Sequence, residues 1–88
     1  AFDLTGERIE KESKKLDDRA LQKTIEIHFR NHKTETVQIT AQERFWGDWK
    51  IQSTTHPYEK KDAYTAEFTI EIPRDQEVVL TYTCIIKW

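Results

Sequence analysis

An alternation of apolar and polar side chains is the feature that most limits how this chain can fold. Ile25, Ile27 and Phe29 fall on every second position of the segment 24–30, which is the period of a half-buried β-strand. The same period returns in the segments 37–41, 49–53, 66–72 and 78–86. Because no segment shows a convincing amphipathic helix, the pattern predicts an all-β domain whose strands each bury one face.

Polar and turn-forming residues divide these runs. The segment from Asn31 to Thr34 separates two alternating runs and predicts a hairpin with a loop of about four residues. Gly47 is compatible with a turn that ends the second of these strands. Pro73 ends the strongest run and predicts a type I turn over Pro73-Arg74-Asp75-Gln76, with proline at its favoured place.

The segment from Glu7 to Leu16 is mostly charged, and Ile9 is its only apolar residue before Leu16. We expect an edge strand over Arg8 to Leu16. Lysine-rich edges discourage pairing with other molecules, and we assign that role to Lys11, Lys14 and Lys15. A charged helix is the alternative, because most of these residues also tolerate helix well.

Short alternating runs joined by turns predict an immunoglobulin-like sandwich of two antiparallel sheets, with about six to seven strands. An open barrel is the alternative, because periodicity does not determine strand order. We expect the segment 1–88 to form a single domain. The chain contains no methionine, which fits a domain excised from a longer protein.

Charge and hydropathy limit the expected partners. The chain has 14 basic and 16 acidic side chains and a net charge of -2, and no segment collects one sign of charge. We therefore expect no nucleic acid partner. The longest apolar run is too short to span a bilayer, so we expect no membrane insertion by this chain, and we expect a monomer in isolation.

Cysteine and histidine are the first candidates for chemistry. Cys84 shares its predicted face with Leu80 and Tyr82, where a thiol behaves as a small hydrophobic group. His28 and His32 are four residues apart, a spacing that places ligands together on a helix but not across a strand and its turn. We predict surface histidines and neither a metal nor another cofactor.

Acidic pairs and short motifs add no catalytic group. Asp17 and Asp18 lie in a predicted turn between the first two strands, where carboxylates are solvated. The chain has neither a glycine-rich phosphate loop nor a nucleophile elbow. The sequence therefore predicts that the domain is not an enzyme.

Aromatic residues near the loops are the strongest candidates for binding. Flat aromatic rings can bind a sugar face or a peptide, because they present apolar area with a polar tip. The alternation predicts that Trp49 belongs to the core. We expect Glu59 to Asp62 to form a solvated turn within the dense stretch 55–65. The predicted binding residues are Trp46, His56, Tyr58 and Tyr64.

Several segments carry a resemblance that spans nearly the whole chain. They are Phe2-Asp3-Leu4-Thr5-Gly6-Glu7-Arg8, Arg30-Asn31-His32-Lys33, Asp48-Trp49, His56-Pro57-Tyr58-Glu59-Lys60 and Leu80-Thr81-Tyr82-Thr83. Together they resemble the carboxy-terminal part of an uncharacterised bacterial domain-of-unknown-function family related to the mucoidy inhibitor A-like proteins. The resemblance implies a β-rich terminal module of a longer, extracytoplasmic bacterial protein. It implies no catalytic residues.

Two functional hypotheses follow from the sequence. The first is a non-catalytic structural or protein-interaction module that recruits a partner by strand addition at the Arg8 to Leu16 edge. The expected partner is the rest of the parent protein or another envelope protein. The alternative is a ligand-binding module, for a glycan or a peptide, that uses the predicted aromatic residues.

Overall fold

Seven strands and no helix make up the described part of the chain, residues 4–88 of a computed structural model. Phe2 and Asp3 of the opening motif lie outside it. The strands are β1 (Leu4–Asp17), β2 (Ala20–Asn31), β3 (Val37–Arg44), β4 (Asp48–Thr54), β5 (Tyr58–Asp62), β6 (Thr65–Ile72) and β7 (Glu77–Lys87).

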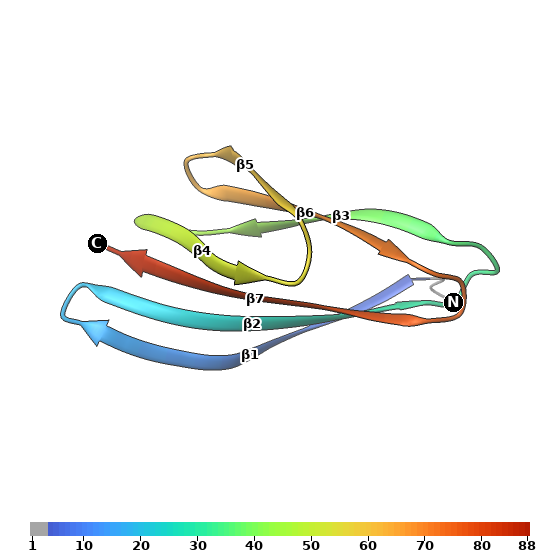
Figure 1. The fold of residues 1–88 in the computed structure, drawn as a ribbon, viewed down its shortest axis with the longest axis horizontal. Helices are drawn as coiled ribbons and strands as arrows, with labels where there is room; N and C mark the ends of the chain where they lie inside the picture. Colours follow the sequence, from blue (N-terminus) through green and yellow to red (C-terminus); the bar gives the residue numbers. More distant parts are fainter. Residues whose placement is uncertain (1–3) are drawn as a thin grey trace.

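The strands form two antiparallel sheets packed face to face (Figure 1). One sheet has the order β1-β2-β7-β4 and the other has the order β3-β6-β5. The predicted two-sheet sandwich is thus confirmed. The strand order differs from that of an immunoglobulin constant domain, in which the fifth strand joins the first, second and fourth. Here β7, and not β5, lies between β2 and β4 in the four-stranded sheet. An immunoglobulin-like relationship therefore stays a prediction.

Aromatic rings fill the space between the two sheets. The ring of Phe68 in β6 stacks on that of Tyr82 in β7, with centroids 5.0 Å apart. Phe45 packs edge-on against Tyr82 and stacks on Trp49 at 4.4 Å. Aliphatic side chains surround these rings, as the alternation predicts, and include the buried Ile25, Ile27, Ile51, Ile70, Ile72, Leu80 and Ile86.

The predicted hairpin between the strands around Ile25 and Ile39 is wrong. The partners of β2 are β1 and β7, whereas β3 pairs with β6 in the other sheet. Alternation reports which face of a strand is buried but not which strand lies beside it, and the segment between β2 and β3 crosses from one sheet to the other. Asn31, fully buried, holds this crossing, because its side-chain amide donates to the carbonyls of Glu35, Ile72 and Pro73.

Two turn predictions are also wrong. The residues from Glu59 to Asp62 belong to the edge strand β5, and the turn follows at Ala63 and Tyr64. The sequence shows no alternation there because every side chain of β5 is exposed. In the turn after β6, the central residues are Arg74 and Asp75. Asp75 has a φ of 51°, which a type I turn does not allow.

The charged amino-terminal segment is an edge strand, as predicted, and not a helix. It pairs with β2 alone among the described strands and begins at Leu4. Asp17 and Asp18 lie at the turn into β2, where the Asp17 carboxylate accepts a hydrogen bond from the backbone N–H of Arg19 at 2.8 Å.

Gly47 holds the connection between β3 and β4 in a conformation that other residues adopt at a cost. Its φ is 67°, and an added Cβ would lie 2.6 Å from the carbonyl oxygen of Lys87. We therefore expect Gly47→Ala to lower the free energy of unfolding, measured by urea titration, by about 1–3 kcal/mol or more. Gly6→Ala is the matched control, since its Cβ would meet only ordinary contacts at 3.6 Å or more. Equal effects of the two changes would contradict this view of Gly47.

Candidate interaction surface

The free edge of β1 is the longest exposed strand edge among the described residues. β1 has 14 residues, whereas the other edge strands, β3, β4 and β5, have 8, 7 and 5. From residue 6 to residue 17, all side chains except Ile9 are exposed. An open edge of this kind presents unpaired backbone N–H and C=O groups to any strand that approaches it.

β1 contains two irregularities that change which side chains share a face. Lys11 is an extra residue between Glu10, which lies opposite Ile25, and Glu12, which lies opposite Thr24. Ile25 faces the core, whereas Thr24 faces away from it and hydrogen-bonds to Thr83. A second register shift follows between Lys15 and Asp17. β-Bulges of this kind increase the local twist of an edge strand.

A polar cluster ties β1 to both sheets. The Tyr82 hydroxyl donates a hydrogen bond of 2.6 Å to Oε1 of Glu43, and the same oxygen accepts a hydrogen bond of 3.0 Å from Nε of Arg8. The Glu43 side chain is 14% exposed, so this carboxylate is largely removed from water. Burial and the hydrogen bond to Glu43 raise the pKa of Tyr82, which keeps the phenol protonated. The cluster therefore holds the first half of β1 against β3 and β7.

Sequence reasoning missed this cluster, although Glu43 carries a signal. It continues the inward positions of β3, where Ile39 and Ala41 pack on the core. A carboxylate at an inward position needs a partner, since burying an unpaired charge is costly. A small cleft of about 180 Å³ opens beside the cluster. It is lined by Arg8, Lys23, Ile25, Arg44, Phe45, Trp46, Tyr82, Cys84 and Ile86.

The four predicted binding residues lie in two groups. Trp46 is 48% exposed and packs against Trp88, with ring centroids 5.0 Å apart. Tyr64 is near this pair, because its carbonyl accepts a hydrogen bond from the backbone N–H of Phe45. Tyr58 packs on Phe68 at 5.8 Å, and the ring Nδ1 of His56 lies 2.8 Å from the Thr55 hydroxyl.

These two groups lie at opposite ends of β4. Trp46 precedes this strand and His56 follows it, and at about 3.4 Å per residue the strand separates them by roughly 20 Å. The structure therefore does not bring the four residues into a single aromatic platform.

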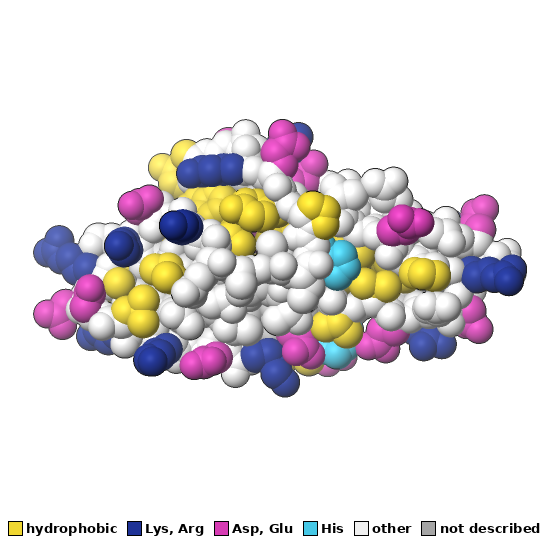
Figure 2. All heavy atoms as spheres, in the orientation of Figure 1, with side chains coloured by type: hydrophobic (Ala, Val, Ile, Leu, Met, Phe, Trp, Pro, Cys, Tyr) yellow, Lys and Arg dark blue, Asp and Glu magenta, His cyan; other side chains and the backbone are white. Residues whose placement is uncertain are grey.

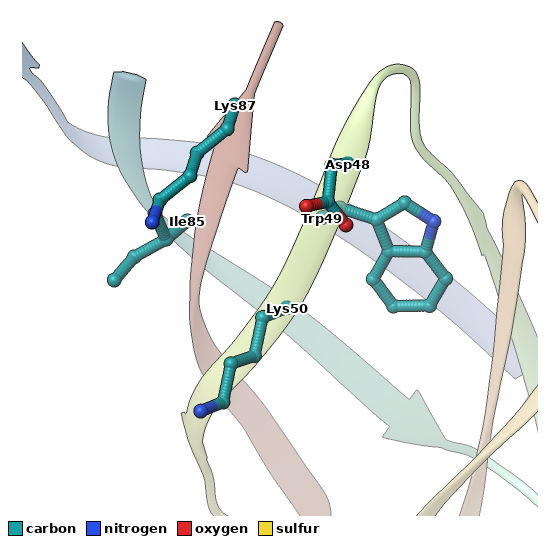
Figure 3. A pocket seen from close by; sticks show the side chains of 5 residues that line it. All are labelled: Asp48, Trp49, Lys50, Ile85 and Lys87. Atoms are coloured by element: carbon teal, nitrogen blue, oxygen red, sulfur yellow. The ribbon is translucent and has the colours of Figure 1, made fainter.

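Trp49 belongs to the core, as predicted. Its indole N–H donates to the carbonyl of Ala63 at 2.8 Å, and the ammonium of Lys60 lies 4.8 Å from a ring centroid. On the opposite face of β4 and β7, Lys50, Ile85 and Lys87 border an open hollow of about 410 Å³, from which the Trp49 ring points away (Figure 3). Both lysines at this hollow are exposed.

The remaining candidates for chemistry are separated. Cys84 is buried in the core, as predicted, and burial raises the pKa of its thiol. His28 lies on the outer face of β2, with Nδ1 2.7 Å from Glu77 and Nε2 2.5 Å from Glu26. His32 is exposed in the crossing between the sheets. Among residues 4–88, no three histidine, cysteine or carboxylate side chains are grouped to hold a metal ion.

Comparison with families of known proteins, with curated proteins and with solved structures finds no match for this chain. None of the described segments forms a helix with the length and apolarity that a bilayer crossing requires. The resemblance to the mucoidy inhibitor A-related family accordingly stays a prediction, and the function has to be argued from the surface of this domain.

Removing the Tyr82 hydroxyl tests the polar cluster. Tyr82→Phe deletes a hydrogen bond to a largely buried carboxylate, and we expect the free energy of unfolding to fall by about 1–3 kcal/mol. Tyr64→Phe is the matched control, because Tyr64 is 59% exposed and such changes cost less than about 0.5 kcal/mol. If chemical denaturation gives the same value for both variants, the cluster does not stabilise the fold.

The His28 contacts predict a dependence of stability on pH. Hydrogen bonds raise the pKa of His28 above its ordinary value near 6.5, and the bond to Glu77 contributes more than the bond to Glu26. This contribution is fully present below the unfolded-state pKa and is lost as the pH rises through the higher folded-state pKa. Urea unfolding between about pH 5 and pH 9 should show this loss, and His28→Gln should reduce it. His32→Gln is the control, and an equal reduction in that variant would contradict the assignment.

Proposed function

We propose that this domain is a non-catalytic interaction module that binds an extended polypeptide segment as an additional strand on the free edge of β1. The observation that carries the proposal is the length of that edge, 14 residues against at most 8 in any other described edge strand. Main-chain hydrogen bonds supply affinity in strand addition, and the flanking side chains supply specificity.

The construction of β1 supports such a role. Arg8 anchors the strand to the sandwich through Glu43 and Tyr82, so the edge is held in place before a partner arrives. A preorganised edge reduces the ordering cost of association. Charged side chains along the edge disfavour partners that lack matching charges, so the lysines that guard β1 also select among incoming strands.

Among the described strands, no other edge is as long as that of β1. Positive and negative side chains are scattered around the rim of the face shown in Figure 2, and the largest group of hydrophobic side chains lies in its upper middle part. The family resemblance suggests two sources for the incoming strand, the remainder of a longer parent protein and another envelope protein, in an extracytoplasmic setting. The ligand-binding alternative has weaker support, because its aromatic residues are split between the two ends of β4.

A library of extended peptides selected against the immobilised domain tests this proposal. We expect the amide shifts of a ¹⁵N-labelled domain to change along β1 and its neighbour β2 when a selected peptide is added. Lys14→Glu should weaken the binding of that peptide. Lys50→Glu, on the edge strand β4, is the matched control and should leave binding unchanged. Shifts confined to Trp46 and Trp88 would instead support the ligand-binding alternative.

A further inference from the structure

We infer that a strand taken up by this edge is β1 of a second copy of the chain, which produces a two-fold symmetric dimer in place of the monomer expected from the sequence. The inference rests on the proposed function and names its partner. Antiparallel pairing of the two β1 strands would join two four-stranded sheets into one continuous sheet and would cover both open edges, as closed dimers do.

The bulge at Lys11 determines which pairings are possible. Before the bulge, Glu7 lies opposite His28 and faces outward, while Arg8 lies opposite the core residue Ile27. After it the order changes, so that Glu12 and Lys14 face outward and Ser13 faces inward. Residues that lie opposite each other in an antiparallel pair share a face. A two-fold axis between Glu10 and Lys11 meets this requirement.

This axis produces attractive charge pairs. Glu7 of each copy lies opposite Lys14 of the other, and Glu10 lies opposite Lys11. The pairs next to these, Arg8 with Ser13, Ile9 with Glu12 and Gly6 with Lys15, contain no like charges. Opposite charges on directly facing strand positions stabilise a pair, and like charges destabilise it.

Neighbouring registers lack this complementarity. Sliding the partner by two residues in one direction places Glu7 opposite Glu12, and sliding it in the other direction places Arg8 opposite Lys15. Each slip therefore brings like charges together, which fixes the register by repulsion as well as by attraction. In the matched register Arg8 faces a small neutral residue, Ser13, and can keep its ion pair with Glu43.

Charge-reversal variants test the dimer by sedimentation velocity at low ionic strength. Glu7→Lys places two lysines opposite each other, and Lys14→Glu places two glutamates opposite each other. We expect each variant to dimerise at least about tenfold more weakly than the original chain. An equimolar mixture of the two should recover the dimer, because both charge pairs are then attractive again. The double variant in a single chain should recover it as well.

Glu71→Lys and Lys50→Glu are the controls, since they make the same charge changes on β6 and β4. Circular dichroism verifies that each variant is folded, and if Glu7→Lys is not, Glu10→Lys mixed with Lys11→Glu replaces it. A chain that stays monomeric at millimolar concentration, or variants that fail to recover on mixing, would overturn the inference. A monomeric chain that still binds a peptide along β1 would contradict the dimer but support the proposed function. A chain that neither dimerises nor binds a peptide along β1 would contradict the proposed function as well.

Discussion

The contact between Phe68 and Tyr82 is the interaction on which the rest of the sandwich depends. The two rings come from different sheets and stack at 5.0 Å, so they set the separation and alignment of β6 and β7. Phe45, Trp49 and Tyr58 extend this aromatic layer toward the edges. Because a chain of 88 residues buries only a small core, a few large rings contribute much of its stability.

Tyr82 also connects the core to the charged edge. Its ring lies in the aromatic layer, and its hydroxyl reaches Glu43, which in turn holds Arg8. A single side chain therefore links the packing of the two sheets to the position of β1. That link helps to hold the mostly charged β1 strand at the edge of a small domain.

Much of the fold could be predicted from the alternation of side chains, because the direction of a side chain on a strand is a local property. The alternation correctly predicts that residues such as Ile25 and Cys84 belong to the core. Strand pairing could not be predicted in the same way, because it depends on contacts between distant segments. The crossing held by Asn31 looks like a hairpin loop in sequence, and β5 lies on an edge where burial imposes no alternation.

The candidate surface was only partly predictable. The charged composition of β1 indicates an edge, but its length and the position of the bulge at Lys11 depend on the pairing with β2. Glu43 could have been found as an acidic residue at an inward position of β3. Its partners could not, since Arg8 and Tyr82 are 35 and 39 residues away in the chain.

Hydrogen exchange along β1 tests most directly whether this edge is open and used for association. In dilute solution, alternate amides of β1 should exchange quickly, because they point away from β2, while the amides between them are protected. At high protein concentration the β1 amides that point away from β2 should become protected from exchange. The exchange rates of the amides in the edge strands β4 and β5 should not change. Uniform protection of β1 in dilute solution, or exchange that does not depend on concentration, would contradict an open edge that pairs with a second copy.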